Sequence, residues 1–190
     1  MSDLLAYATL GFRHITDLAA MDHVLFLLAL AAVYRPRDWR DALWVVTAFT
    51  VGHSVTLALA ATGTLRLSRD VVEFLIPVTI VATGVENLVV RDRAAAPLGR
   101  RYRPVFAGVF GLVHGAGFAN YLRSLFSGSI ALPLLGFNAG IELGQLVILL
   151  AAALALSGVD RLLGHRARVV AVSATVVLVA AFMTVERVPW

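Results

Sequence analysis

The residues of this 190-residue chain that could do chemistry are histidines and acids placed inside long apolar runs. An ionisable side chain in the middle of a bilayer costs at least about 2.5–3.5 kcal/mol, so several in one small protein indicate a function. The chain has no cysteine, which leaves imidazole and carboxylate as ligands for a metal ion. Such ligands suit Ni²⁺, Co²⁺ or Zn²⁺ better than Cu⁺. The residues that we predict to bind a divalent transition metal are Asp22, His23, His53, His114 and Glu142.

A second set of polar residues is predicted to support this site or to control access to it. Asn138, Glu142 and Gln145 are spaced i, i+4, i+7, which places them on one face of a helix. Glu142 is therefore the acid with the strongest case for a function. The supporting or gating residues are predicted to be His14, Asn138, Gln145 and Glu86.

Several of these residues keep two interpretations. Asp22 is either a direct ligand or an acceptor that orients His53 or His114, because adjacent helical residues point about 100° apart and Asp22 and His23 would not serve one ion symmetrically. His14 is either an interfacial histidine or a residue of the site or its entrance. Glu86 is either an inner gate or a structural partner of nearby polar side chains. A buried histidine such as His53 also has the structural alternative of bonding to a backbone carbonyl.

The elements that must position these side chains are predicted to be transmembrane helices. Hydrophobic residues make up 59% of the chain, charged residues 15%, and the mean hydropathy is +0.84, which indicates membrane-spanning segments rather than a soluble domain. We expect one all-α transmembrane bundle over residues 1–190. Its six spans are predicted at about 15–34, 42–62, 71–90, 104–119, 131–157 and 169–185.

The arginines indicate how the bundle is oriented. All 16 basic residues are arginine, and 11 of them lie in the loops after the first, third and fifth predicted spans. The positive-inside rule then places both termini outside the cytoplasm. Because these arginines serve as topology signals, we exclude nucleic acid as a partner despite the net charge of +4 and the pI near 10.3. With a rise of about 1.5 Å per residue, the five predicted ligands fall at similar depth on four spans, and Glu86 lies deeper.

Four local strings, taken together, resemble the HupE/UreJ family of bacterial membrane proteins. They are residues 14–17 with 22–26, residues 49–57, residues 111–119 and residues 137–145. The resemblance implies a small multi-span protein of the bacterial inner membrane that acts as a nickel or cobalt permease. In such permeases a histidine precedes an Asp-His pair by a few residues. Here seven residues separate His14 from Asp22, which is longer than the usual spacing.

Three hypotheses for function follow. The first is a transporter of a divalent metal cation, with the bilayer and the metal ion as partners and a homo-oligomer compatible with the sequence. The second is an intramembrane zinc-dependent hydrolase that acts on a lipid or a membrane-embedded substrate. In that case Glu142 or Asp22 would be the general base, with Ser54 or Asn138 assisting. The third is a structural membrane subunit, which ranks last because the polar set is energetically costly.

Overall fold

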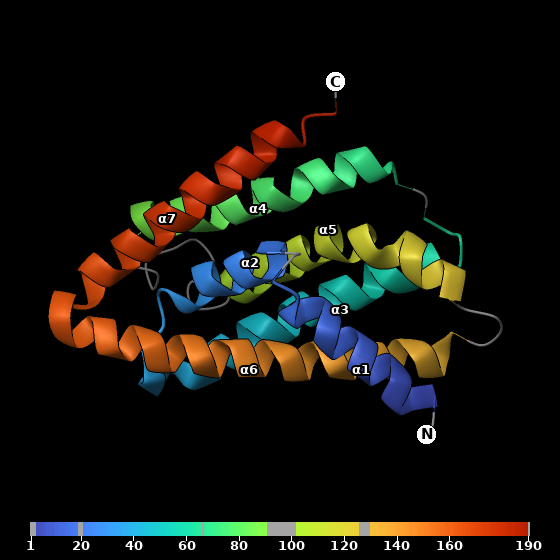
Figure 1. Cartoon of the computed structure of the whole chain (residues 1–190), viewed down its shortest axis with the longest axis horizontal. Coiled ribbons are helices and arrows are strands. Elements are labelled where there is room, and N and C mark those ends of the chain that lie inside the picture. The colour runs from blue at the N-terminus through green and yellow to red at the C-terminus, as the bar shows by residue number, and fades with distance from the viewer. Residues whose placement is uncertain (1–2, 19–20, 66, 91–101, 126–129, 190) are drawn as a thin grey trace.

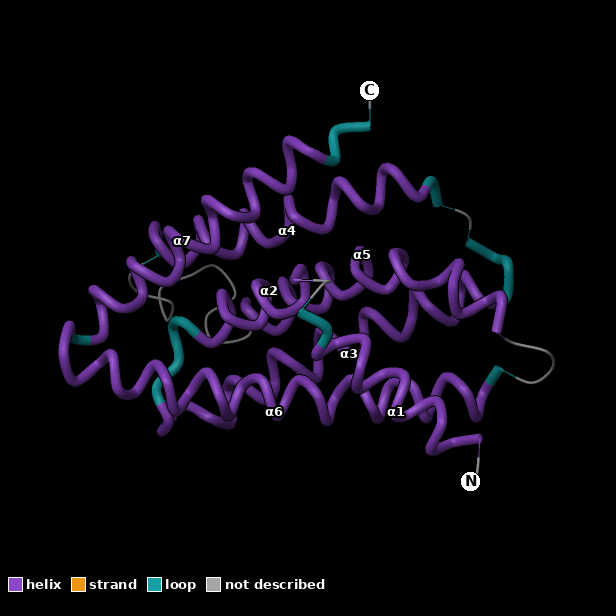
Figure 2. Tube along the Cα trace, viewed as in Figure 1, coloured by secondary structure: helices purple, strands orange, loops and turns teal. Residues whose placement is uncertain are grey.

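The computed structural model describes residues 3–18, 21–65, 67–90, 102–125 and 130–189, and these segments form α-helices joined by short turns (Figure 1). The helices are α1 (Asp3–Thr16), α2 (Met21–Ala31), α3 (Trp39–Ala61), α4 (Arg69–Val89), α5 (Tyr102–Leu125), α6 (Ala131–Leu163) and α7 (His165–Glu186). A 3-10 turn, Pro36–Asp38, precedes α3. No strand occurs within the described ranges (Figure 2), so the predicted all-α class is confirmed for them. Helices satisfy their own backbone hydrogen bonds, which is what apolar segments require in hydrocarbon.

Four helical segments are long and apolar enough to cross a membrane: Pro36–Ala61, α4, α6 and α7. The pair α1 and α2 qualifies as one further span that is bent by 71° at a short break. Among the described residues, four or five segments could therefore cross a membrane, whereas the sequence predicted six spans. The predicted span at 104–119 falls in α5, which is not long and apolar enough to be one of them. Large apolar side chains such as Leu150, Leu154 and Leu178 are more than 60% exposed, which suits a lipid-facing surface.

The first predicted span, 15–34, is not one helix. Helix α1 ends at Thr16 and α2 begins at Met21. The two halves pack against different partners, because α1 lies along α6 while α2 runs through the middle of the bundle and contacts α4, α6 and α7 (Figure 1). A straight helix could not make both sets of contacts.

Helices α3 and α5 are held together by glycines. A Cβ atom on Gly52 would overlap the backbone of α5. A Cβ on Gly111 or Gly115 would overlap the carbonyl oxygen of Phe49 or His53 on α3. Small residues of this kind allow two helix backbones to approach closely, and van der Waals packing then stabilises the pair in lipid. The backbone that carries His53 is therefore fixed directly by α5.

Helices α1 and α6 form a second glycine-mediated pair. Side chains at Gly11 or Gly140 would overlap the carbonyl oxygens of Phe137 and Ala8 on the opposite helix. This contact lies one turn before His14, so it fixes the end of α1 against α6. The two helix pairs thus place His14 of α1, His53 of α3 and His114 of α5 in the same region of the bundle.

One end of the bundle contains the turns that join α2 to α3 and α6 to α7, and both termini lie at the opposite end (Figure 1). We call the former the arginine end, because Arg35, Arg103 and Arg168 gather there. The Arg103 guanidinium donates to Glu86 Oε2 at 2.7 Å and to Asn87 Oδ1 at 2.8 Å. The Arg103 and Glu86 side chains are 7% and 10% exposed, so this ion pair is buried.

Replacing Arg103 by leucine is expected to lower the free energy of unfolding by about 3–5 kcal/mol, because it removes the guanidinium that pairs with the buried Glu86 carboxylate. Denaturant unfolding in detergent would measure the change. The control is Arg69→Leu, which removes the partner of Glu73 on an exposed face and should leave stability nearly unchanged. Equal stability of the two variants would show that the buried pair does not stabilise this end of the bundle.

Candidate metal centre

Histidines from separate helices meet inside the bundle. His14 lies in the last turn of α1, His23 in the first turn of α2, and His53 in the middle of α3. One ring nitrogen from each lies within 4.8 Å of the other two. These three residues are the histidine cluster. His114 of α5 is its neighbour, with a ring centroid 5.4 Å from that of His23.

The break between α1 and α2 is what brings two of these histidines together. His14 and His23 are nine residues apart, which is about 13 Å along a continuous helix. Because the chain turns by 71° between the two helices, their ring centroids lie only 4.7 Å apart. The helix break is therefore part of the site.

Phenylalanine rings pack around the histidines, of which His14 is partly exposed and the other three are buried. Phe118 lies 4.0 Å from His14 between ring centroids, and Phe49 lies 5.2 Å from His114. His23, His53 and His114 are at most 6% exposed. The remaining phenylalanines of this surround are Phe26 and Phe137, which pack against His114 and against His14 and His53.

The buried imidazoles lack hydrogen-bond partners. Among the described residues, none bonds to either ring nitrogen of His23 or of His53, nor to Nε2 of His14. A buried polar group left in this way costs about 1–3 kcal/mol. A metal cation would use the free lone pairs, and a set of imidazole nitrogens fits Ni²⁺, Co²⁺ or Zn²⁺. Two nitrogens on one tetrahedral ion at about 2.1 Å are about 3.4 Å apart, so a shift of about 1 Å per ring would suffice.

Thr79 of α4 sets the tautomer of His114. The Thr79 hydroxyl donates its single proton to the carbonyl oxygen of Ile76 at 2.7 Å. Its oxygen also lies 2.9 Å from His114 Nε2, an arrangement that favours the tautomer in which Nε2 carries the proton and donates. The other nitrogen, Nδ1, is then unprotonated, buried and without a hydrogen-bond partner among the described residues. His114 thereby presents a lone pair of the kind that a metal needs.

The polar stripe of α6, which consists of Asn138, Glu142 and Gln145, packs against α3 one turn from His53. Thr47 Oγ1 donates to Glu142 Oε1 at 3.3 Å, and Thr50 Oγ1 lies 2.8 Å from Gln145 Oε1. The stripe therefore lies beside the histidine cluster. No carboxylate of the described residues is part of the three-residue group itself.

Other candidates of the sequence analysis contact different partners. Asp22 Oδ2 is paired with Arg187 Nη1 at 3.1 Å, while its Oδ1 is buried and has no hydrogen-bond partner among the described residues. Glu86 is paired with Arg103 at the arginine end, away from the histidines. The Ser54 hydroxyl donates to the Thr50 carbonyl at 2.6 Å. Asn138 has a buried Oδ1 with no hydrogen-bond partner in the part of the chain that is described.

One residue of the site was not anticipated from the sequence, and another had two interpretations. His14 was expected either in the site or at its entrance, and the structure groups it with His23 and His53. Thr79 was not singled out, because a threonine in an apolar span bonds most often to its own helix backbone. A signal for His14 existed in Asp17, a poor helix former that marks the segment between His14 and His23 as a place for a break.

The model of a protein family described as HupE / UreJ protein matches residues 1–187, a range that includes every described helix and all of the site residues. No curated protein matches the chain. No solved structure matches it either.

Proposed function

Because this chain belongs to the HupE/UreJ family, we propose that it carries a divalent transition-metal cation of the Ni²⁺ or Co²⁺ type across the bacterial inner membrane. The resemblance noted in the sequence is thus confirmed at the level of the family. The observation that carries the proposal is the histidine cluster, whose buried ring nitrogens have no hydrogen-bond partners among the described residues. Such nitrogens are suited to replacing the water molecules of a hydrated cation.

The donor set agrees with cargo that must be released as well as captured. Neutral imidazoles bind a transition metal without cancelling its charge, and conduction requires binding that is not too tight. Asp22 is adjacent to His23 in the chain, and Glu142 accepts a hydrogen bond from Thr47 on the helix that carries His53. We propose that they complete the coordination or compensate the charge when the cation is present, and the unpartnered Oδ1 of Asp22 supports this role.

The alternative is an intramembrane zinc-dependent hydrolase. Three histidines and an open position would suit it, but it also requires a general base beside a metal-bound water. Among the described residues, no carboxylate belongs to the group of three histidines, so none is placed as a base beside a water bound there. The absence of a carboxylate from the described residues of this group favours the transporter.

The proposal is tested by uptake of ⁶³Ni²⁺ into proteoliposomes that contain the purified protein. Uptake above that of protein-free liposomes, reduced by excess Co²⁺ and unaffected by Mg²⁺, is the expected result, because imidazole ligands discriminate against Mg²⁺. Tightly bound stoichiometric Zn²⁺ together with an absence of uptake would overturn the transporter and favour the hydrolase.

Thr79→Val is expected to weaken binding of Ni²⁺ by about 10–100-fold, because His114 loses the partner that fixes its tautomer and ring orientation. Equilibrium dialysis with ⁶³Ni²⁺ would measure the affinity. Thr79→Ser keeps the hydroxyl and should restore it. The control Thr175→Val changes an exposed threonine of α7 that bonds only to its own helix backbone. If Thr79→Val binds Ni²⁺ as tightly as this control, Thr79 does not position His114 for the metal.

A further inference from the structure

A groove of about 370 Å³ lies between α3 and α6 at the arginine end. Its walls are mainly leucines and alanines, and the turn between α2 and α3 closes one end of it. On α6 it follows residues 146–157, which is roughly 16 Å of helix. Leu146, Leu150 and Leu154 on this wall are 39%, 63% and 69% exposed, so the groove opens toward the surroundings of the bundle. In a membrane those surroundings are hydrocarbon.

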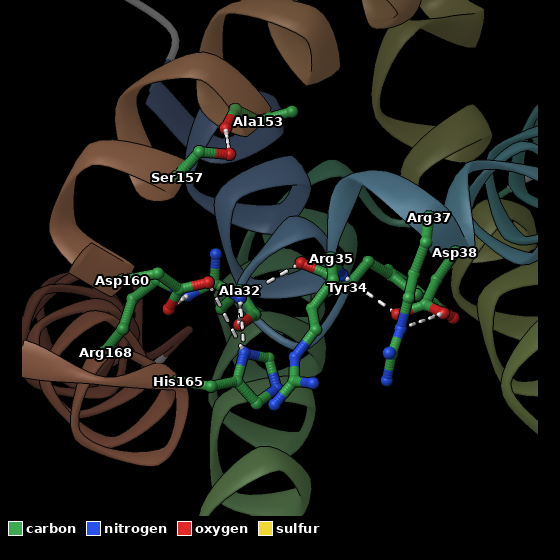
Figure 3. Close-up of polar contacts among 10 residues, drawn as sticks. All are labelled: Ala32, Tyr34, Arg35, Arg37, Asp38, Ala153, Ser157, Asp160, His165 and Arg168. Atoms are coloured by element: carbon green, nitrogen blue, oxygen red, sulfur yellow. Dashed lines mark hydrogen bonds and ion pairs between the residues drawn. The ribbon is translucent and has the colours of Figure 1, made fainter.

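Arg168 does not line the groove, but it lies at the same end of the bundle and its guanidinium is already paired. Arg168 is 1% exposed and forms an ion pair with Asp160 at 3.1 Å. It also donates to the carbonyl oxygens of Ala32 and Tyr34, as Figure 3 shows. Arg168 is therefore fully engaged in holding the end of α2.

Arg35, which lines the groove, has no carboxylate partner among the described residues. Its backbone N–H donates to Asp38 Oδ2 at 3.0 Å, and the other oxygen of Asp38 faces Arg37 at 3.7 Å. The Arg35 side chain instead extends beside the ring of His165 (Figure 3). An arginine without a carboxylate partner creates a local demand for an anion.

We propose that this groove binds an anionic phospholipid, with its phosphate at Arg35 and one acyl chain between α3 and α6. The guanidinium matches phosphate oxygens in a bidentate manner, and basic pockets between membrane helices bind anionic head groups in this way. Trp39 lies at the rim and is 55% exposed, as is typical of aromatic residues at the membrane interface. The lipid site stands independently of the metal site, because its lining includes no residue of the histidine cluster.

The test uses Trp39 as a reporter. In a protein with Trp44→Phe and Trp190→Phe, Trp39 is the single tryptophan. This protein is reconstituted into phosphatidylcholine vesicles that contain either brominated phosphatidylglycerol or brominated phosphatidylcholine, whose bromine atoms quench tryptophan fluorescence on contact. We expect about fivefold preferential binding of the phosphatidylglycerol, the size of effect that one arginine at a membrane surface supplies.

Variants test the charge of Arg35 and the shape of the groove separately. Arg35→Gln should abolish the preference, while Arg35→Lys should retain most of it. Arg161→Gln, which removes an exposed arginine of the same end outside the groove lining, should retain it fully. Ala153→Leu fills the groove and should reduce quenching by both brominated lipids. Equal quenching by the two lipids, a preference that survives Arg35→Gln, or quenching unchanged by Ala153→Leu would overturn the proposal.

Discussion

His53→Ala is expected to weaken ⁶³Ni²⁺ binding by at least about 100-fold and to stop uptake into proteoliposomes. The loss of a direct ligand should cost at least as much as the loss of a supporting partner, which is about 10–100-fold. We expect the largest loss of affinity at His53, because it is 1% exposed and lies in the helix that both α5 and the polar stripe of α6 contact. Equilibrium dialysis and uptake in proteoliposomes would measure the two quantities separately.

A matched control for this prediction is His165→Ala. His165 is the one histidine of the chain outside the group formed by the histidine cluster and His114, and it lies at the arginine end next to Arg168. Its loss should leave the affinity for Ni²⁺ and the rate of uptake unchanged. If His53→Ala binds Ni²⁺ as tightly as His165→Ala does, the cation does not bind at the histidine cluster.

The same measurements distinguish the two interpretations of His14. If His14 is a ligand, as its distance to His23 and His53 suggests, His14→Ala should lower the affinity to a similar extent as His53→Ala. If it serves only at the entrance, the affinity should remain and the uptake rate alone should fall.

The second large effect is expected at Gly115, where alanine should destabilise the protein by about 3 kcal/mol or more and also impair metal binding. The new Cβ would overlap the carbonyl oxygen of His53, so α3 and α5 must separate. Overpacking typically costs about 1–3 kcal/mol, and a clash with backbone falls at or above the upper end, since backbone cannot change rotamer. The midpoint of thermal unfolding in detergent and ⁶³Ni²⁺ binding would both be measured.

Gly158→Ala is the matched control for Gly115→Ala. Gly158 also lies within a helix, but a Cβ there would meet no atom within 4 Å. The substitution should be neutral or should stabilise α6 by up to about 1 kcal/mol, because alanine favours the helix. Equal stability of the two alanine variants would contradict the idea that glycine contacts hold α3 against α5.

Much of the fold follows from local properties of the sequence. Long apolar runs predicted helices that overlap α3, α4, α5, α6 and α7, because hydropathy and helix formation are properties of contiguous residues. The first span could not be predicted in the same way. Residues 15–34 read as one apolar run, and the break before Met21 depends on α1 and α2 packing against different helices.

For the site, the sequence determined which residue types are available: four histidines in apolar segments, no cysteine, and a polar stripe on α6. The tertiary structure decided which of them meet. The helix break places His14 beside His23 and His53. Asp22 forms an ion pair with Arg187, and Glu86 forms one with Arg103. Thr79 contacts His114. Hydropathy and periodicity act along the chain, whereas these pairings depend on glycine contacts and side-chain directions between segments far apart in sequence. Such contacts leave no periodic signal, so only the packed bundle determines them.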